Sequence, residues 1–122
     1  MSNAEIEKFC MALKGTEQDI KWGNDLCYTI GKKMYCVTSL KGEASVSFKT
    51  TPEKFNELIE RTGIIPAPYV AKYHWVMVEN FKALSVKEWK MYIKESYEMV
   101  LDKLPKKLRA EFKDDRINRI KD

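Results

Sequence analysis

Few side chains in this sequence suit acid–base or covalent chemistry, and their spacing does not favour it. His74 is the one histidine of the chain, so a metal site built on several histidines has no ligands. No serine or cysteine stands in a Gly-x-Ser-x-Gly context, and neither a Walker loop nor a Gly-x-Gly-x-x-Gly run occurs. We therefore expect a protein that is not an enzyme and that uses no cofactor and no metal.

The cysteines are odd in number and follow no Cys-x-x-Cys or metal-ligand spacing; they are Cys10, Cys27 and Cys36. Two of them lie inside apolar runs, which favours buried free thiols over disulfides. Reduced thiols are typical of a reducing compartment, so we expect a cytoplasmic protein. No apolar run approaches the roughly 18 residues of a membrane span, and no basic, then apolar leader opens the chain, so no membrane association is expected.

A run in which aromatic and basic residues alternate is the most distinctive chemical feature. Tyr69, Lys72, Tyr73, His74 and Trp75 lie within seven consecutive residues. Aromatic faces stack on bases and lysine neutralises phosphate, so this run fits contact with single-stranded or distorted nucleic acid. The competing interpretation makes Trp75 a core residue and His74 a partly buried imidazole that hydrogen-bonds to the backbone.

Lysines in predicted turns are a second set of candidate contacts. Lys32 and Lys33 directly follow a glycine, and Lys41 directly precedes one. Hairpin tips project from a sheet, so lysines there reach a phosphate backbone as the wing of a winged DNA-binding domain does. Lys49, on the solvent face of a predicted strand, is a further candidate. For all four lysines, ordinary solubility is the competing interpretation.

The excess positive charge is confined to the C-terminus. The formal net charge is +4, and the last twenty residues hold eight basic against four acidic side chains. The rest of the chain is therefore neutral, and the net charge supports nucleic-acid binding only through the tail. We divide the chain into an α+β domain over residues 1–107 and a charged helical extension over residues 108–122.

Short helices and strands are predicted to position these residues. Helical periodicity predicts helices at about 4–14, from Pro52 until Gly63, at 86–103, and a charged one after Pro105. Ser2 with Glu5 and Ser85 with Glu88 have capping-box spacing. The apolar stripe expected on the third helix is Val86, Trp89, Ile93, Val100 and Leu104, and the sparse contacts expected after Pro105 are Leu108, Phe112 and Ile120.

Five strands are predicted from apolar or alternating runs between turn residues: Ile20–Gly23, Leu26–Gly31, Lys33–Ser39, Glu43–Lys49 and His74–Val78. Pro66 and Pro68 make residues 64–69 an ordered loop. Strands joined by short turns favour α+β architecture, with a single antiparallel sheet of about five strands and helices packed mainly on one face. Alternation in the fourth strand places Val46 and Phe48 on the buried face.

Several segments together resemble the MmcQ/YjbR family over roughly residues 4–107. They are Ile20–Gly23, Gly31–Cys36, Val46–Lys49, Lys72–Trp75, and Ser96-Tyr97 ahead of Leu104-Pro105. The resemblance implies a CyaY-like (frataxin-like) fold and a DNA-binding role, because the family's strand hairpins are similar to a double wing. Carried onto this sequence, it implies contacts by the hairpin lysines and by Lys72, His74 and Trp75.

Two other functions compete with DNA binding. The frataxin likeness suggests iron binding, but hard cations need a dense carboxylate ridge, and the first helix offers only Glu5 and Glu7 with two lysines beside them. A protein-interaction module or small homodimer, using the exposed C-terminal helix, is the stronger alternative. The sequence does not separate that alternative from nucleic-acid binding.

Overall fold

The computed structural model describes residues 1–41 and 44–112. Predictions that fall elsewhere, including the contact at Ile120 and most of the proposed extension over 108–122, lie outside the described residues. In the described part, residues 106–112 are helical, as expected after Pro105, and Leu108 and Phe112 pack half-buried against the core.

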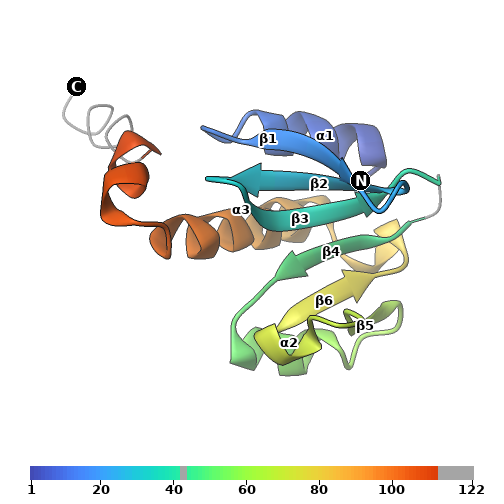
Figure 1. Ribbon diagram of the computed structural model, residues 1–122. Helices are drawn as coiled ribbons and strands as arrows, with labels where there is room; N and C mark the ends of the chain where they lie inside the picture. The colour runs from blue at the N-terminus through green and yellow to red at the C-terminus, as the bar shows by residue number, and fades with distance from the viewer. Residues whose placement is uncertain (42–43, 113–122) are drawn as a thin grey trace.

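The described residues form one antiparallel sheet of six strands in the order β1-β2-β3-β4-β6-β5 (Figure 1). Every neighbouring pair is antiparallel. The strands are β1 (Glu17–Lys21), β2 (Asp25–Ile30), β3 (Lys33–Ser39), β4 (Val46–Lys49), β5 (Ile64–Pro66) and β6 (Trp75–Val78).

Helices cover one face of this sheet. Figure 1 shows α1 (Asn3–Met11) and α3 (Val86–Asp102) behind the sheet, and α2 (Pro52–Leu58) beside β5 and β6. Ser2 caps α1 by accepting from the Glu5 N–H, and Ser85 with Glu88 forms the complete capping box of α3. The α+β class, the single antiparallel sheet and the one-sided packing are thus confirmed.

The core lies between α3 and the covered face of the sheet. Phe48 of β4 is fully buried and stacks on Tyr92, with ring centroids 5.8 Å apart. Its ring also meets Trp89 edge-on at 6.4 Å. Val46 is fully buried on the same face, so the alternation predicted for this strand is confirmed.

The strand count was wrong by one, because the loop predicted for 64–69 contains β5. This strand pairs with β6 on one side only, so Pro66 occupies a sheet edge, where a missing N–H is tolerated. The first strand is Glu17–Lys21 rather than Ile20–Gly23, since Trp22 and Gly23 have φ of 55° and 76° and leave the extended conformation.

Some other element boundaries also differ from the prediction. The fourth strand begins at Val46 instead of residue 43, which lies outside the described residues, and the first two helices end earlier, at Met11 and Leu58. Val86 was placed in the apolar stripe of the third helix but is 49% exposed. It occupies the first helical position, directly after the Ser85 cap.

Candidate functional site

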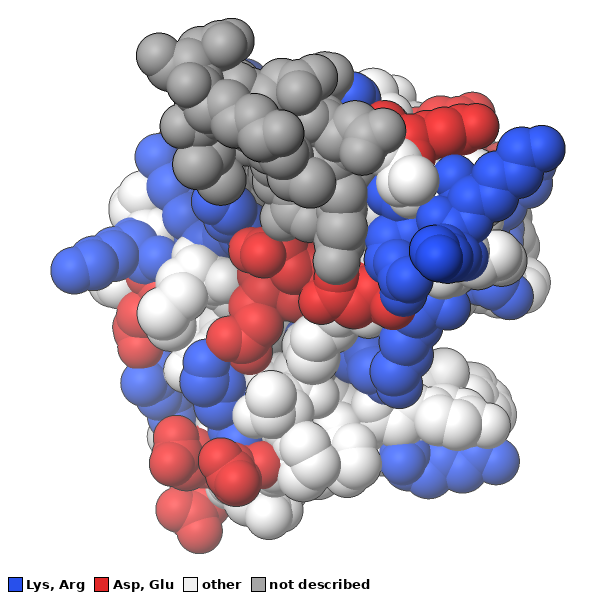
Figure 2. Space-filling model, turned by 90° about the vertical axis from the view of Figure 1, so that its left-hand side faces the viewer, with Lys and Arg blue, Asp and Glu red and all other residues white. Residues whose placement is uncertain are grey.

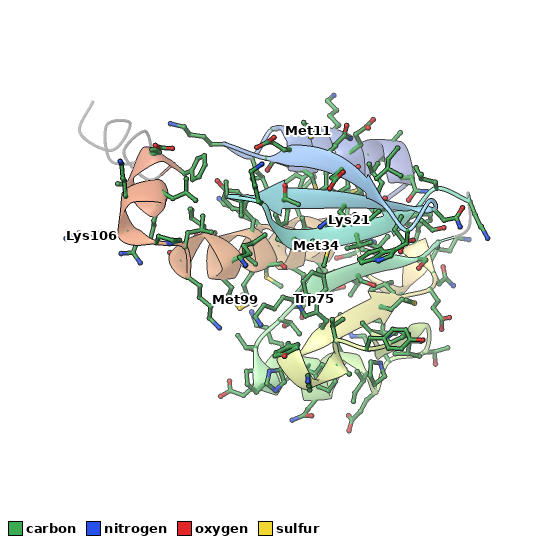
Figure 3. All side chains as sticks on the ribbon, viewed as in Figure 1. Met11, Lys21, Met34, Trp75, Met99 and Lys106 are labelled. Carbon is green, nitrogen blue, oxygen red and sulfur yellow. The ribbon has the colours of Figure 1, made fainter. Side chains whose placement is uncertain are left out.

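A groove of about 330 Å³ opens at the end of the sheet where β3 begins and β4 ends, beside the C-terminal end of α3. Apolar side chains make up most of its lining, and Figure 3 shows three of them, Met34, Trp75 and Met99, at this place on three different elements. None of the residues lining it is acidic. The full lining is Lys33, Met34, Lys49, Tyr73, Trp75, Met99, Val100, Lys103, Leu104 and Pro105.

Lys49 is the most constrained of the three lysines in the groove. Its side chain is half-buried, and its ammonium group donates to the Tyr73 carbonyl over 3.0 Å. Burial lowers the pKa of Lys49, and the charge of the nearby Lys103 lowers it further. Two cations facing one apolar groove repel each other, so a bound anion would be stabilised there.

A β-bulge sets the position of Met34 in the groove. The pairing of β2 with β3 shifts from Tyr28↔Cys36 to Thr29↔Met34, so Tyr35 has no partner in the ladder. Tyr35 is fully buried and its hydroxyl reaches the Cys10 carbonyl at 3.3 Å, under the helices. Because the bulge adds one residue, Met34 turns to the uncovered face of the sheet.

Ser96 of α3 bridges the gap that this bulge leaves between β3 and β4. Its hydroxyl donates to the Tyr35 carbonyl over 2.6 Å and accepts from the Lys49 N–H over 2.9 Å. The ladder between the two strands stops at the Cys36↔Phe48 pair, one residue short of Lys49. A buried serine therefore replaces one direct ladder bond and fixes the backbone of a groove lysine.

The structure brings together three of the residues predicted to contact nucleic acid, Lys33, Lys49 and Trp75. Lys32 is exposed beside them in the β2–β3 turn, with a φ of 67°. Trp75 is only 7% exposed, so the competing interpretation of it as a packed residue is also met.

The other three predicted residues lie elsewhere. Lys41 follows the far end of β3, so the turn lysines do not form one surface. Lys72 is exposed, with its ammonium group 5.1 Å from the centre of the Tyr73 ring. His74 is half-buried, and its ring meets Phe55 of α2 edge-on at 5.7 Å instead of lining the groove.

Sequence reasoning missed Lys103, Met34 and Met99 as groove residues. Met99 and Lys103 are four residues apart at the end of a predicted helix, which indicates a shared helical face. That spacing alone does not show which strand the face meets.

Three of the four net positive charges fall within residues 103–112, a segment that begins at the groove residue Lys103. Lys103, Lys106, Lys107 and Arg109 all precede the first residue outside the described range. Figure 2 looks at this end of the molecule and shows lysine and arginine side chains gathered around a central band of acidic ones. Anions are therefore favoured locally, at the groove, and not over the whole end of the molecule.

Other chemical features are few in the part of the chain that the structure describes. All three cysteines are buried and free, as predicted from their apolar surroundings. Residues 1–41 and 44–112 contain no group of three His, Cys, Asp or Glu side chains placed to hold a metal ion. No described helix is long and apolar enough to cross a lipid bilayer.

Comparison with known proteins gives a family and similar structures. The YjbR family model matches residues 11–99. The crystal structure of the Deinococcus radiodurans protein DR2400, which has the domain DUF419, aligns with 92% of this chain and 88% of its own at a TM-score of 0.82 and 23% identity. A crystal structure of a Pseudomonas syringae protein aligns with 82% of this chain and 99% of its own, with a TM-score of 0.68 and 20% identity. No curated protein matches the sequence.

At these identities the two crystal structures support the fold alone. The family match covers most of the chain, and it includes Lys33, Lys49 and Trp75 but ends before Lys103. The matched region thus supplies the groove residues up to Met99, and Val100, Lys103, Leu104 and Pro105 lie beyond it. The resemblance seen in the short motifs is confirmed, and the chain belongs to the YjbR family.

Proposed function

We propose that the groove binds nucleic acid, with its lysines on the phosphates and Tyr73 stacked on a base. The observation that carries the proposal is the convergence of Lys33, Lys49 and Lys103, from three elements, on an apolar groove without a carboxylate in its lining. Such a site favours anions that also carry an apolar or aromatic part, and nucleotides are anions of this kind.

The exposed tyrosines, rather than Trp75, are the side chains that we propose to stack on bases. Tyr73 is 52% exposed and Tyr69 fully exposed, so both offer ring faces to a base. Trp75 presents little surface and serves as part of the groove wall. Lys41, Lys72 and His74, which do not line the groove, are not part of the proposed interface.

The expected binding is salt-sensitive and weak. Three lysine–phosphate contacts give a log–log salt slope of about −2.1 on single-stranded DNA and about −2.7 on duplex. We expect little sequence preference, because phosphate contacts and base stacking do not read base edges.

The test is a fluorescence anisotropy titration of labelled single-stranded and duplex DNA at several salt concentrations. Combining Lys33→Ala with Lys103→Ala should reduce the single-strand slope by about 1.4, since two phosphate contacts are lost. The matched control combines Lys41→Ala with Lys90→Ala, which removes the same charge from exposed lysines outside the groove. Equal losses in both variants, or no binding at low salt, would contradict the proposal.

We further propose, with the family resemblance as support, that the fold is CyaY-like and that the protein acts in the cytoplasm without catalysis. The three buried thiols agree with a reducing compartment. Turnover of a common ester, phosphoester or nucleotide that His74→Ala abolishes without unfolding the protein would overturn the non-enzymatic role.

A further inference from the structure

The two edges of the sheet are unequal. β5 is a three-residue strand that ends on Pro66, and both features discourage pairing with another chain. β1, at the opposite edge, has five residues and no proline, and among the described residues it pairs only with β2. Its outer backbone groups are therefore available for strand addition.

Apolar side chains at the β1 edge are unusually exposed. Ile20 within the strand is 60% exposed, and Trp22 directly after it is 70% exposed. Leu40 follows β3 rather than lying on the edge strand, but its N–H donates to the Asn24 carbonyl of the β1–β2 turn, and it is 48% exposed. Large apolar side chains grouped at one edge are characteristic of an interaction surface.

The sequence of β1 is complementary to itself in one antiparallel register. When two copies pair about Ile20, Asp19 of each copy faces Lys21 of the other, so both charged pairs are of opposite sign. Ile20 then meets its own counterpart on the other face of the sheet, since side chains alternate along a strand.

The two neighbouring registers are worse. Pairing centred on Asp19 sets two carboxylates directly opposite each other, and pairing centred on Lys21 sets two ammonium groups opposite each other. Like charges in directly opposed positions destabilise a strand pair. Charge thus selects the register centred on Ile20 from the three.

We infer that β1 is a self-association edge, at which a second copy of this chain adds its own β1 in antiparallel orientation about Ile20. The dimer is a two-fold, isologous one in which the two sheets join into one. The contact is small compared with a stable interface of about 800 Å² per partner, so the dimer is weak and depends on concentration. This inference does not depend on nucleic-acid binding, because β1 contributes no residue to the groove.

Charge reversal provides the test, with sedimentation velocity of the full chain over a concentration series as the readout. Asp19→Lys and Lys21→Asp should each weaken dimerisation by about tenfold or more, because each creates two like-charge pairs. An equimolar mixture of the two variants should form a heterodimer, since every cross-strand pair is then of opposite sign. The double variant should dimerise like the unmodified protein.

Glu17→Lys is the matched control. In the proposed register only residues 19–21 pair, because Trp22 and Gly23 leave the extended conformation, so residue 17 has no cross-strand partner and this variant should dimerise as the unmodified protein does. Pairing centred on Asp19 would instead set residue 17 against Lys21 and weaken the dimer. Far-UV circular dichroism checks that each variant is folded. An unmodified protein that stays monomeric at the highest concentration, or a variant mixture that forms no heterodimer, overturns the inference.

Discussion

Removing the Ser96 hydroxyl should destabilise the protein far more than its size suggests. Ser96→Ala deletes one oxygen atom at a fully buried position and takes away the partners of two buried backbone groups. These are the Tyr35 carbonyl and the Lys49 N–H, which lie just beyond the last paired residues of the β3–β4 ladder, Cys36 and Phe48. An unpaired buried group costs about 1–3 kcal/mol, so we expect a loss of about 2–4 kcal/mol.

Urea denaturation followed by circular dichroism measures this loss as a change in the midpoint at constant slope. Ser47→Ala is the matched control, because Ser47 lies in β4 on the uncovered face and is half-buried. That change should stay within about 0.5 kcal/mol. If Ser96→Ala also costs less than about 0.5 kcal/mol, the hydroxyl does not bridge the two strands as described.

Three further outcomes are expected. The pKa of Glu88 is lowered to about 2, chiefly by its hydrogen bond with Arg61. Ionised Glu88 therefore stabilises the folded state fully above the ordinary pKa of a glutamate, and this stabilisation is lost as the pH falls toward 2. Urea titrations should show Glu88→Gln costing about 1 kcal/mol at pH 7, since the pair is partly exposed, and nothing near pH 2. Gly31→Ala should lower the free energy of unfolding by at least about 1 kcal/mol more than Gly23→Ala. Both positions have positive φ, but only at Gly31 would the new Cβ meet Leu104, at 2.8 Å. Equal losses in the two variants would contradict this contact. Alkylation under denaturing, non-reducing conditions should add three labels in intact-mass measurement, and a single label would reveal a disulfide.

Turn residues, apolar runs and helix caps in the sequence predicted helices and strands well where tertiary packing favours the same structure. The predicted strand Lys33–Ser39 has the observed bounds because a turn precedes it and apolar residues dominate it. The Ser85–Glu88 capping box gave the start of α3 correctly. β5 was missed because Pro66 within it and Pro68 shortly after it argue against a strand, and only the place of β5 at a sheet edge makes Pro66 acceptable.

The groove was only partly predictable. The lysines at 33 and 49 were candidates from their turn and strand positions, but the bulge that turns Met34 toward them leaves no clear mark in the sequence. Lys103 joins them only because α3 packs across β3 and β4, which is a tertiary effect. Lys41 lies apart from Lys32 for a simple geometric reason: successive turns of a meander lie at opposite ends of the sheet.

The position of β6 between β4 and β5 constrains the order in which the chain can fold. β1 to β4 pair in sequence and can assemble as local hairpins while the chain is still being synthesised. β5 contacts the sheet through β6, so it must wait for a strand that emerges later. α1 is made first, but the part of the face that α3 covers stays open until α3 follows. A nascent chain stalled before Ser85 would therefore expose Phe48, which packs on Trp89 and Tyr92 of α3. Productive folding of this domain therefore depends on completing the last long helix.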